Sequence, residues 1–147
     1  MNTNLIEIFL NTLIKKTESN GILWSTIRHT EDQFILRQVS IYHIGYRTID
    51  PLGSFYYETK SGRILVLYEI SVNAPKEEKM SPKINLLVQP AKDADYIQIP
   101  LNKRLYRKLE DLHDSITSRY ISNFLTDNQE KIISKFILNV IEETTRN

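Results

Sequence analysis

The chain has 147 residues, of which 41% are hydrophobic, and its 19 Lys and Arg side chains nearly balance 18 Asp and Glu side chains. This composition excludes a mainly disordered chain, and the missing basic excess argues against a general polyanion binder. The absence of cysteine excludes a disulfide scaffold and a cysteine-ligated zinc site. We expect one compact domain over residues 1–147.

No apolar run approaches the roughly 20 residues that cross a bilayer, because the longest is Ile64–Tyr68. The first apolar stretch is interrupted by Glu7 and followed by Lys15 and Lys16, which reverses the charge order of a signal peptide. We therefore expect a cytoplasmic location and no membrane contact.

The first predicted element is a helix over Asn4–Thr17. Its apolar residues recur at three- and four-residue spacing and cover almost half of the helix circumference; they are Leu5, Ile6, Phe9, Leu10, Leu13 and Ile14. A stripe this wide is typical of a helix that packs on a sheet.

The middle of the chain predicts strands joined by short connections, which favours antiparallel pairing. The predicted strands are Ile22–Arg28, Phe34–Ser40, Ile41–Ile49, Ser54–Thr59, Arg63–Val72, Ile84–Gln89 and Tyr96–Ile99. Residues 30–32 predict a turn between the first two strands. Residues 60–62 close the clearest hairpin, and residues 73–82 form a long charged loop, typical of a binding loop or a tolerated insertion.

The strand Arg63–Val72 is apolar on both faces at its centre. Ile64 and Val66 point to one face, whereas Leu65 and Leu67 point to the other. Such a strand needs cover on both sides. If the terminal helices cover one face, the other requires a further helix, a curled sheet or a partner chain.

Helical periodicity returns in the last third of the chain. A narrow leucine stripe predicts a helix over Lys103–Ser118, residues 120–125 predict a short helical turn, and a broad apolar face predicts a last helix over Asn128–Glu143. The predicted fold class is α+β: an N-terminal helix, a mainly antiparallel sheet of five to seven strands, and two C-terminal helices packed on the sheet. Because Leu138 lies off the main apolar face of the last helix, a homodimer stays open.

No catalytic, metal or cofactor motif is present, so we expect no cofactor and no metal. The four glycines form no phosphate loop, and no serine has a nucleophile-elbow context. His29, His43 and His113 are far apart, and only His29 has nearby carboxylates, Glu31 and Asp32, in what we interpret as a solvated turn. An active site assembled from distant residues remains an alternative.

The helix that begins at Lys103 reverses the usual charge order. Its first turns carry the candidate binding residues, Lys103, Arg104, Arg107 and Lys108. Cations at a helix N-terminus oppose the helix dipole, at a cost of about 0.3–1 kcal/mol each when exposed. A basic cluster beside free backbone N–H groups is a candidate seat for an anionic ligand or an acidic surface, although a solvated charged face is the simpler interpretation.

These observations together predict a non-catalytic interaction protein, such as a regulator, an inhibitor or an immunity-type protein, that binds a macromolecular partner, most simply another protein. One alternative is a small-ligand or nucleotide binder that uses sheet tyrosines with the basic helix start; it predicts a concave tyrosine-lined face. Another alternative is a nucleic-acid-binding module, which predicts affinity that falls steeply with salt.

Overall fold

The computed structural model describes residues 2–28, 30–124 and 126–146, with residues 121–124 described by their backbone alone. A six-stranded antiparallel sheet has the order β1-β3-β4-β5-β6, and β2 pairs with the far end of β4. The strands are β1 (Ser25–Thr26), β2 (Arg47–Ile49), β3 (Phe55–Glu58), β4 (Arg63–Ser71), β5 (Lys83–Gln89) and β6 (Ile97–Gln98). The predicted α+β class and its mainly antiparallel sheet are confirmed.

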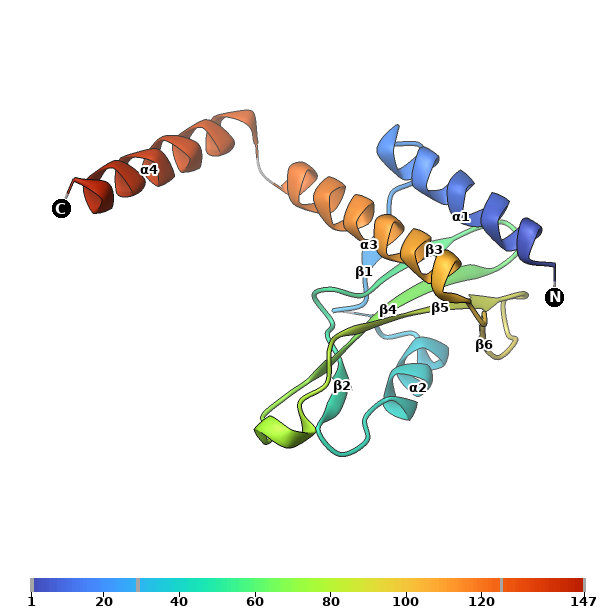
Figure 1. Cartoon of the computed structure of the whole chain (residues 1–147). Coiled ribbons are helices and arrows are strands. Elements are labelled where there is room, and N and C mark those ends of the chain that lie inside the picture. The colour runs from blue at the N-terminus through green and yellow to red at the C-terminus, as the bar shows by residue number, and fades with distance from the viewer. Residues whose placement is uncertain (1, 29, 125, 147) are drawn as a thin grey trace.

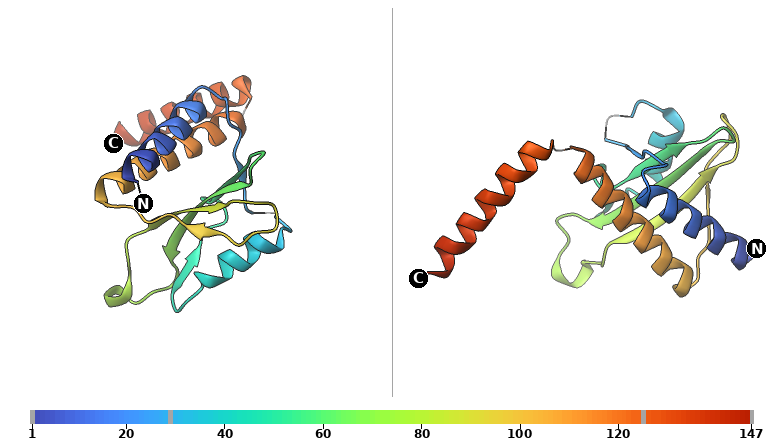
Figure 2. Two further views of the ribbon diagram at one scale, coloured as in Figure 1. Left: turned by 90° about the vertical axis from the view of Figure 1, so that its right-hand side faces the viewer. Right: turned by 90° about the horizontal axis from the view of Figure 1, so that it is seen from above.

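Helices lie on both faces of this sheet (Figures 1 and 2). Helix α1 (Thr3–Glu18) and helix α3 (Lys103–Phe124) lie side by side on one face, and helix α2 (Gln33–Ile41) lies on the other. Helix α4 (Asp127–Thr145) follows α3 and extends away from the sheet, and a 3-10 turn at Lys76–Glu78 interrupts the long charged loop. None of the described helices combines the length and the apolar composition that crossing a bilayer takes.

The central strand β4 separates two hydrophobic cores, as its two apolar faces predict. Ile64 and Val66 join the core under α1 and α3, where the α3 leucine stripe is almost completely buried. Leu65 and Leu67 join the second core, with Ile35 of α2. The second face is therefore covered by a helix of the same chain.

That covering helix corrects the predicted strand Phe34–Ser40. Ile35 and Val39 favour a strand by intrinsic preference, but Phe34, Ile35 and Val39 also fall on one side of a helix. Asp32, which we predicted to lie in a hairpin turn, caps α2 by accepting a hydrogen bond from the Ile35 N–H at 3.0 Å. Burial of Ile35 against the sheet stabilises the helical alternative.

Other boundaries differ from the prediction. Only residues 25–26 of the first predicted strand, and 47–49 of Ile41–Ile49, are paired as strands. Residues 120–124, predicted as a separate turn, continue α3, and Leu125 lies outside the described residues. The predicted packing of the last helix on the sheet is wrong, because no residue of α4 is buried.

Candidate functional site

Two of the four side chains in the predicted basic cluster contact the neighbouring helix α1. Arg104 Nη1 donates a hydrogen bond to Glu7 Oε2 at 2.6 Å, and Lys108 Nζ donates to Asn11 Oδ1 at 3.0 Å. Lys108 Nζ also lies 3.9 Å from Glu7 Oε1. The hydrogen bond from Arg104 is the main cause that lowers the pKa of Glu7, against a smaller opposing effect of burial. Two of the four cations thus join α3 to α1.

The other two cations, Lys103 and Arg107, are exposed beside a shallow hollow of about 460 Å³. The hollow also receives Lys83 from β5 and the acidic Glu110 from α3. The first turn of α3 is already capped, because Asn102 Oδ1 accepts a hydrogen bond from a backbone N–H at 2.9 Å. This cap weakens the case for an anion held by the helix N-terminus. Binding at the cluster stays a prediction.

The sheet tyrosines do not share one face. Tyr57 and Tyr68 pack against the core under α1 and α3. Tyr42 and Tyr56 pack against the core under α2. Tyr46 is 44% exposed. The concave tyrosine-lined face that the small-ligand alternative predicts is therefore not formed by these five residues.

The two described histidines have structural partners. His113 Nε2 donates to the Gly53 carbonyl oxygen at 2.7 Å, and its ring stacks on Tyr68 with centroids 5.0 Å apart. His43 Nδ1 lies 3.3 Å from Thr48 Oγ1. His29, the histidine with nearby carboxylates in the sequence, lies outside the described residues. The described part of the chain contains no group of three His, Cys, Asp or Glu residues that could hold a metal ion.

A row of polar side chains, which the sequence reasoning missed, crosses the sheet beside the end of α2, and its central members Glu69 and Asn85 are buried. Arg47 Nη2 donates to Glu69 Oε1 at 2.5 Å, and Asn85 Nδ2 donates to Glu69 Oε2 at 3.4 Å. Gln98 Nε2 donates to Asn85 Oδ1, and the Tyr42 hydroxyl donates to Gln98 Oε1, both at 3.0 Å. Burial is the main cause that raises the pKa of Tyr42.

This polar row borders a hollow of about 330 Å³. The strand alternation could have revealed it, because Glu69 follows Leu65 and Leu67 on the same apolar face and pairs with Lys83 across the sheet. Each polar side chain of the row binds the next, so the row fixes the pairing of β2, β4, β5 and β6. Its carboxylate already has a cationic partner, so this geometry does not favour a general base.

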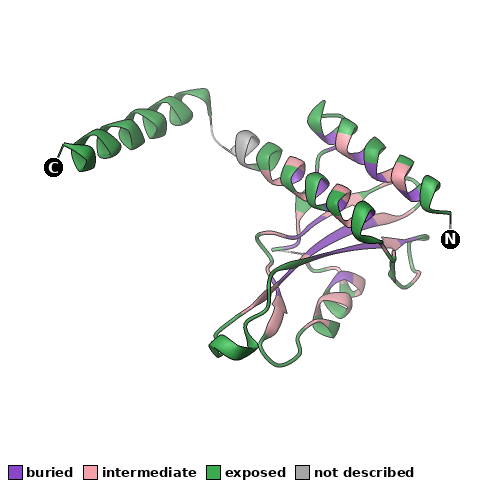
Figure 3. Cartoon of the chain, in the orientation of Figure 1, coloured by how far each residue is buried: buried purple, intermediate pink, exposed green. Residues whose placement is uncertain are grey.

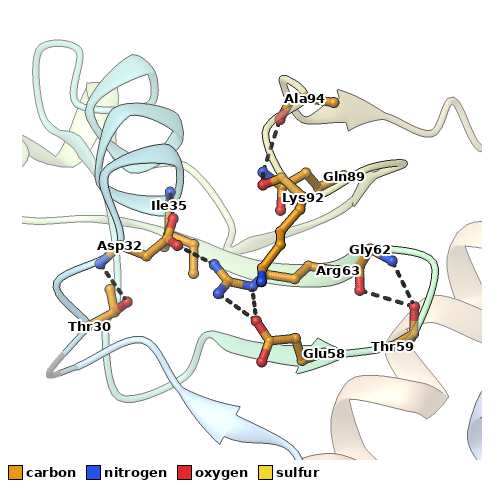
Figure 4. Close-up of polar contacts among 10 residues, drawn as sticks. All are labelled: Thr30, Asp32, Ile35, Glu58, Thr59, Gly62, Arg63, Gln89, Lys92 and Ala94. Atoms are coloured by element: carbon orange, nitrogen blue, oxygen red, sulfur yellow. Dashed lines mark hydrogen bonds and ion pairs between the residues drawn. The ribbon is translucent and has the colours of Figure 1, made fainter.

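A second polar cluster attaches α2 to the β3–β4 hairpin (Figure 4). Arg63 donates to Glu58 Oε1 through Nε at 2.6 Å, and it also forms an ion pair with Asp32, the cap of α2. Burial opposes ionisation of Asp32, but the hydrogen bonds from Arg63 and Ile35 outweigh it and lower the pKa of Asp32. The same carboxylates raise the pKa of Arg63. One guanidinium is therefore shared by two carboxylates.

The surface next to this cluster is hollowed between the β3–β4 turn and the end of β5. Its volume is about 460 Å³, and its polar lining includes Arg63, Gln89 and Lys92. Gln89 Nε2 donates to the carbonyl oxygens of Lys92 and Ala94 at 3.2 and 2.9 Å. The amide therefore holds the loop that follows β5 and is not free for a ligand.

Among the described residues, the clearest exposed apolar surface lies on helix α4. None of its residues is buried, whereas α1, α2 and α3 each bury part of one face (Figure 3). Six apolar side chains on one side of α4 are between 39% and 66% exposed; they are Ile132, Ile133, Phe136, Ile137, Val140 and Ile141. We call these six residues the apolar face of α4. A contiguous exposed apolar face of this kind marks an interaction site.

The opposite side of α4 is polar. Leu138, 65% exposed, lines a shallow surface groove there with Asp127, Lys131 and Lys135. The helix begins with a capping box, in which Thr126 and Gln129 exchange side-chain-to-backbone hydrogen bonds at 3.1 and 2.9 Å. Helix α4 thus combines a formed cap, a polar side and an exposed apolar side.

Comparison with known proteins adds no relative: no family model, no curated protein and no solved structure matches this chain. Function must therefore be argued from the geometry.

Proposed function

We propose that this protein is a non-catalytic cytoplasmic interaction protein, of the regulator, inhibitor or immunity type, that docks on a protein partner through the apolar face of α4. The observation that carries the proposal is the exposure of that face, on which no residue is buried. The three other α-helices bury apolar residues within the chain, whereas α4 has the same kind of apolar side, which the described part of the chain leaves unburied.

The energy available at this surface is large enough to drive binding. The exposed fractions of the six side chains amount to about three complete apolar side chains, and burying each one contributes about 1.5–3 kcal/mol. A partner that covers the face therefore gains about 5–9 kcal/mol from this helix alone, before its own apolar surface is counted. Most of the stability of a protein helix comes from the packing of its apolar face, so docking also stabilises α4 itself.

The charges of α4 favour a protein partner over an anionic membrane. Helices that lie on membranes are rich in Lys and Arg on their polar side. Helix α4 has two lysines, Lys131 and Lys135, against four acids, Asp127, Glu130, Glu142 and Glu143. A negatively charged lipid surface would repel this helix, whereas an apolar protein groove would accept it.

Native mass spectrometry tests the proposal with two matched variants of the tagged chain, purified gently from its own host. Ile137→Glu places a charge within the apolar face, and Leu138→Glu places the same charge on the polar side. We expect the wild type and Leu138→Glu to retain a bound protein mass and Ile137→Glu to appear as the bare 17.3 kDa chain. A bare wild-type chain, or a complex that Ile137→Glu leaves intact, contradicts the proposal.

A further inference from the structure

The arrangement of apolar residues on α4 indicates which protein covers its apolar face. We infer that α4 pairs in antiparallel orientation with α4 of a second copy of this chain, so that the protein is a homodimer. The inference rests on the proposed function and narrows it, because it names the partner that docks on the same surface.

The first argument is the symmetry of the apolar face along the helix. Its residues come as three adjacent pairs at four-residue intervals, 132–133, 136–137 and 140–141. Suppose that α4 of a second copy runs antiparallel to the first, with the two-fold axis passing between Phe136 and Ile137. The middle apolar pair then lies at the same height along the helix axis as the middle pair of the second copy. The same arrangement also places the first pair level with the third pair of the second copy. Every apolar level then meets an apolar level, as a two-fold symmetric interface requires.

The second argument is the helix dipole, which separates the antiparallel from the parallel arrangement. A parallel pair would place the two positive N-terminal ends of α4 side by side, and likewise the two negative C-terminal ends. The antiparallel pair instead places the N-terminal end of each α4 beside the C-terminal end of the other, so that the two helix dipoles attract each other.

The third argument is accessibility and length. Helix α4 extends away from the sheet, so a second helix can approach without meeting the rest of the chain (Figure 1). A helix of 19 residues is about 28 Å long, which provides five turns of contact on each copy. Because a symmetric pair contributes the same face twice, the apolar surface removed from water is double that of one α4.

Disulfide trapping tests the orientation directly, because the chain has no cysteine of its own. In the antiparallel pair, residue 137 lies beside its counterpart, whereas the two copies of residue 133 are about 10 Å apart and those of residue 141 about 13 Å apart along the axis. Disulfides do not form when the Cα atoms are more than about 7 Å apart. We therefore introduce single cysteines as Ile133→Cys, Ile137→Cys and Ile141→Cys in the full chain.

We expect mild oxidation to cross-link Ile137→Cys to itself and to leave Ile133→Cys and Ile141→Cys, each alone, uncross-linked. A mixture of the last two variants should form a disulfide-linked species of twice 17.3 kDa. Self-cross-linking of all three variants shows a parallel pair and overturns the inferred orientation.

Sedimentation equilibrium of the chain without cysteines measures the dimer independently. We expect a mass of twice 17.3 kDa for the wild type and for Leu138→Glu, and a single-chain mass for Ile137→Glu with an unchanged circular dichroism spectrum of the sheet. A wild-type chain that stays monomeric overturns the second copy as partner. In that case the proposed function still stands if Ile137→Glu, but not Leu138→Glu, removes a different bound protein in the native mass spectrum, and it fails together with the inference if no bound mass is found.

Discussion

Replacing Gly62 with alanine should strongly destabilise the fold, because this residue lies where the β3–β4 turn meets the end of β5. An alanine Cβ at this position would lie 1.8 Å from the Gln89 carbonyl oxygen, whereas an ordinary contact is 3.4–4 Å. The φ angle of Gly62 is also positive, at +155°. Gly45 gives a matched control, since its φ is +60° and nothing lies within 4 Å of its added Cβ.

The two substitutions share one destabilising effect and differ in another. In both variants, an L side chain at positive φ lowers the free energy of unfolding by about 1–3 kcal/mol. Gly62→Ala must in addition move β4 away from β5, which weakens the hydrogen bonds that Gly62 exchanges with Thr59 at 2.7–3.1 Å and the neighbouring pairing of Arg63 with Gln89. At about 1 kcal/mol for each hydrogen bond, this adds about 2–3 kcal/mol.

Urea denaturation followed by circular dichroism measures the difference. With a urea dependence of about 1–3 kcal/mol/M for a chain of this size, the midpoint for Gly62→Ala should fall below that of Gly45→Ala by about 1–2 M. Equal midpoints for the two variants would refute the close approach of Gly62 to β5 as the reason for the glycine.

Three further predictions concern the contacts that position the helices. Arg63→Met removes the donor shared by Asp32 and Glu58, and we expect the free energy of unfolding to fall by about 1–2 kcal/mol; an unchanged thermal midpoint would show that the ion pairs do not hold α2. The pKa of Asp32 lies below its ordinary 3.8, so its ionised form stabilises the fold above pH 3.8, and this contribution is lost as the pH falls further through the folded-state pKa. Asp32→Asn should flatten that part of the acid-unfolding curve, and parallel curves for variant and wild type would contradict the argument. Leu109→Ala, at a position that is 0% exposed, should cost about 2–5 kcal/mol, whereas Ile137→Ala should cost less than about 0.5 kcal/mol under conditions where the chain is monomeric; calorimetry on both variants tests this contrast.

The sequence determined those elements whose pattern is strong and local. The apolar stripes of α1 and α3 predict helices because residues three and four apart share a helix face, and the hairpin at 55–71 follows from alternation on both sides of a glycine turn. The two apolar faces of β4 also predicted cover on both sides of the sheet. That prediction holds because residue alternation in a strand needs no tertiary information.

Tertiary structure decided what depends on residues far apart in the chain. The segment 34–40 fits a strand or a helix by its own pattern, and burial of Ile35 against the far face of the sheet selects the helix. Arg104 was predicted to be free for an anionic ligand, but it pairs with Glu7, which is 97 residues away. No local sequence pattern indicates that pairing. The same limit applies to α4: its periodicity predicts an apolar face, but only the packed structure shows that the sheet faces are already occupied and leave that face bare. Periodicity fixes which side of a helix is apolar, whereas the contact that buries it depends on the space left by every other element.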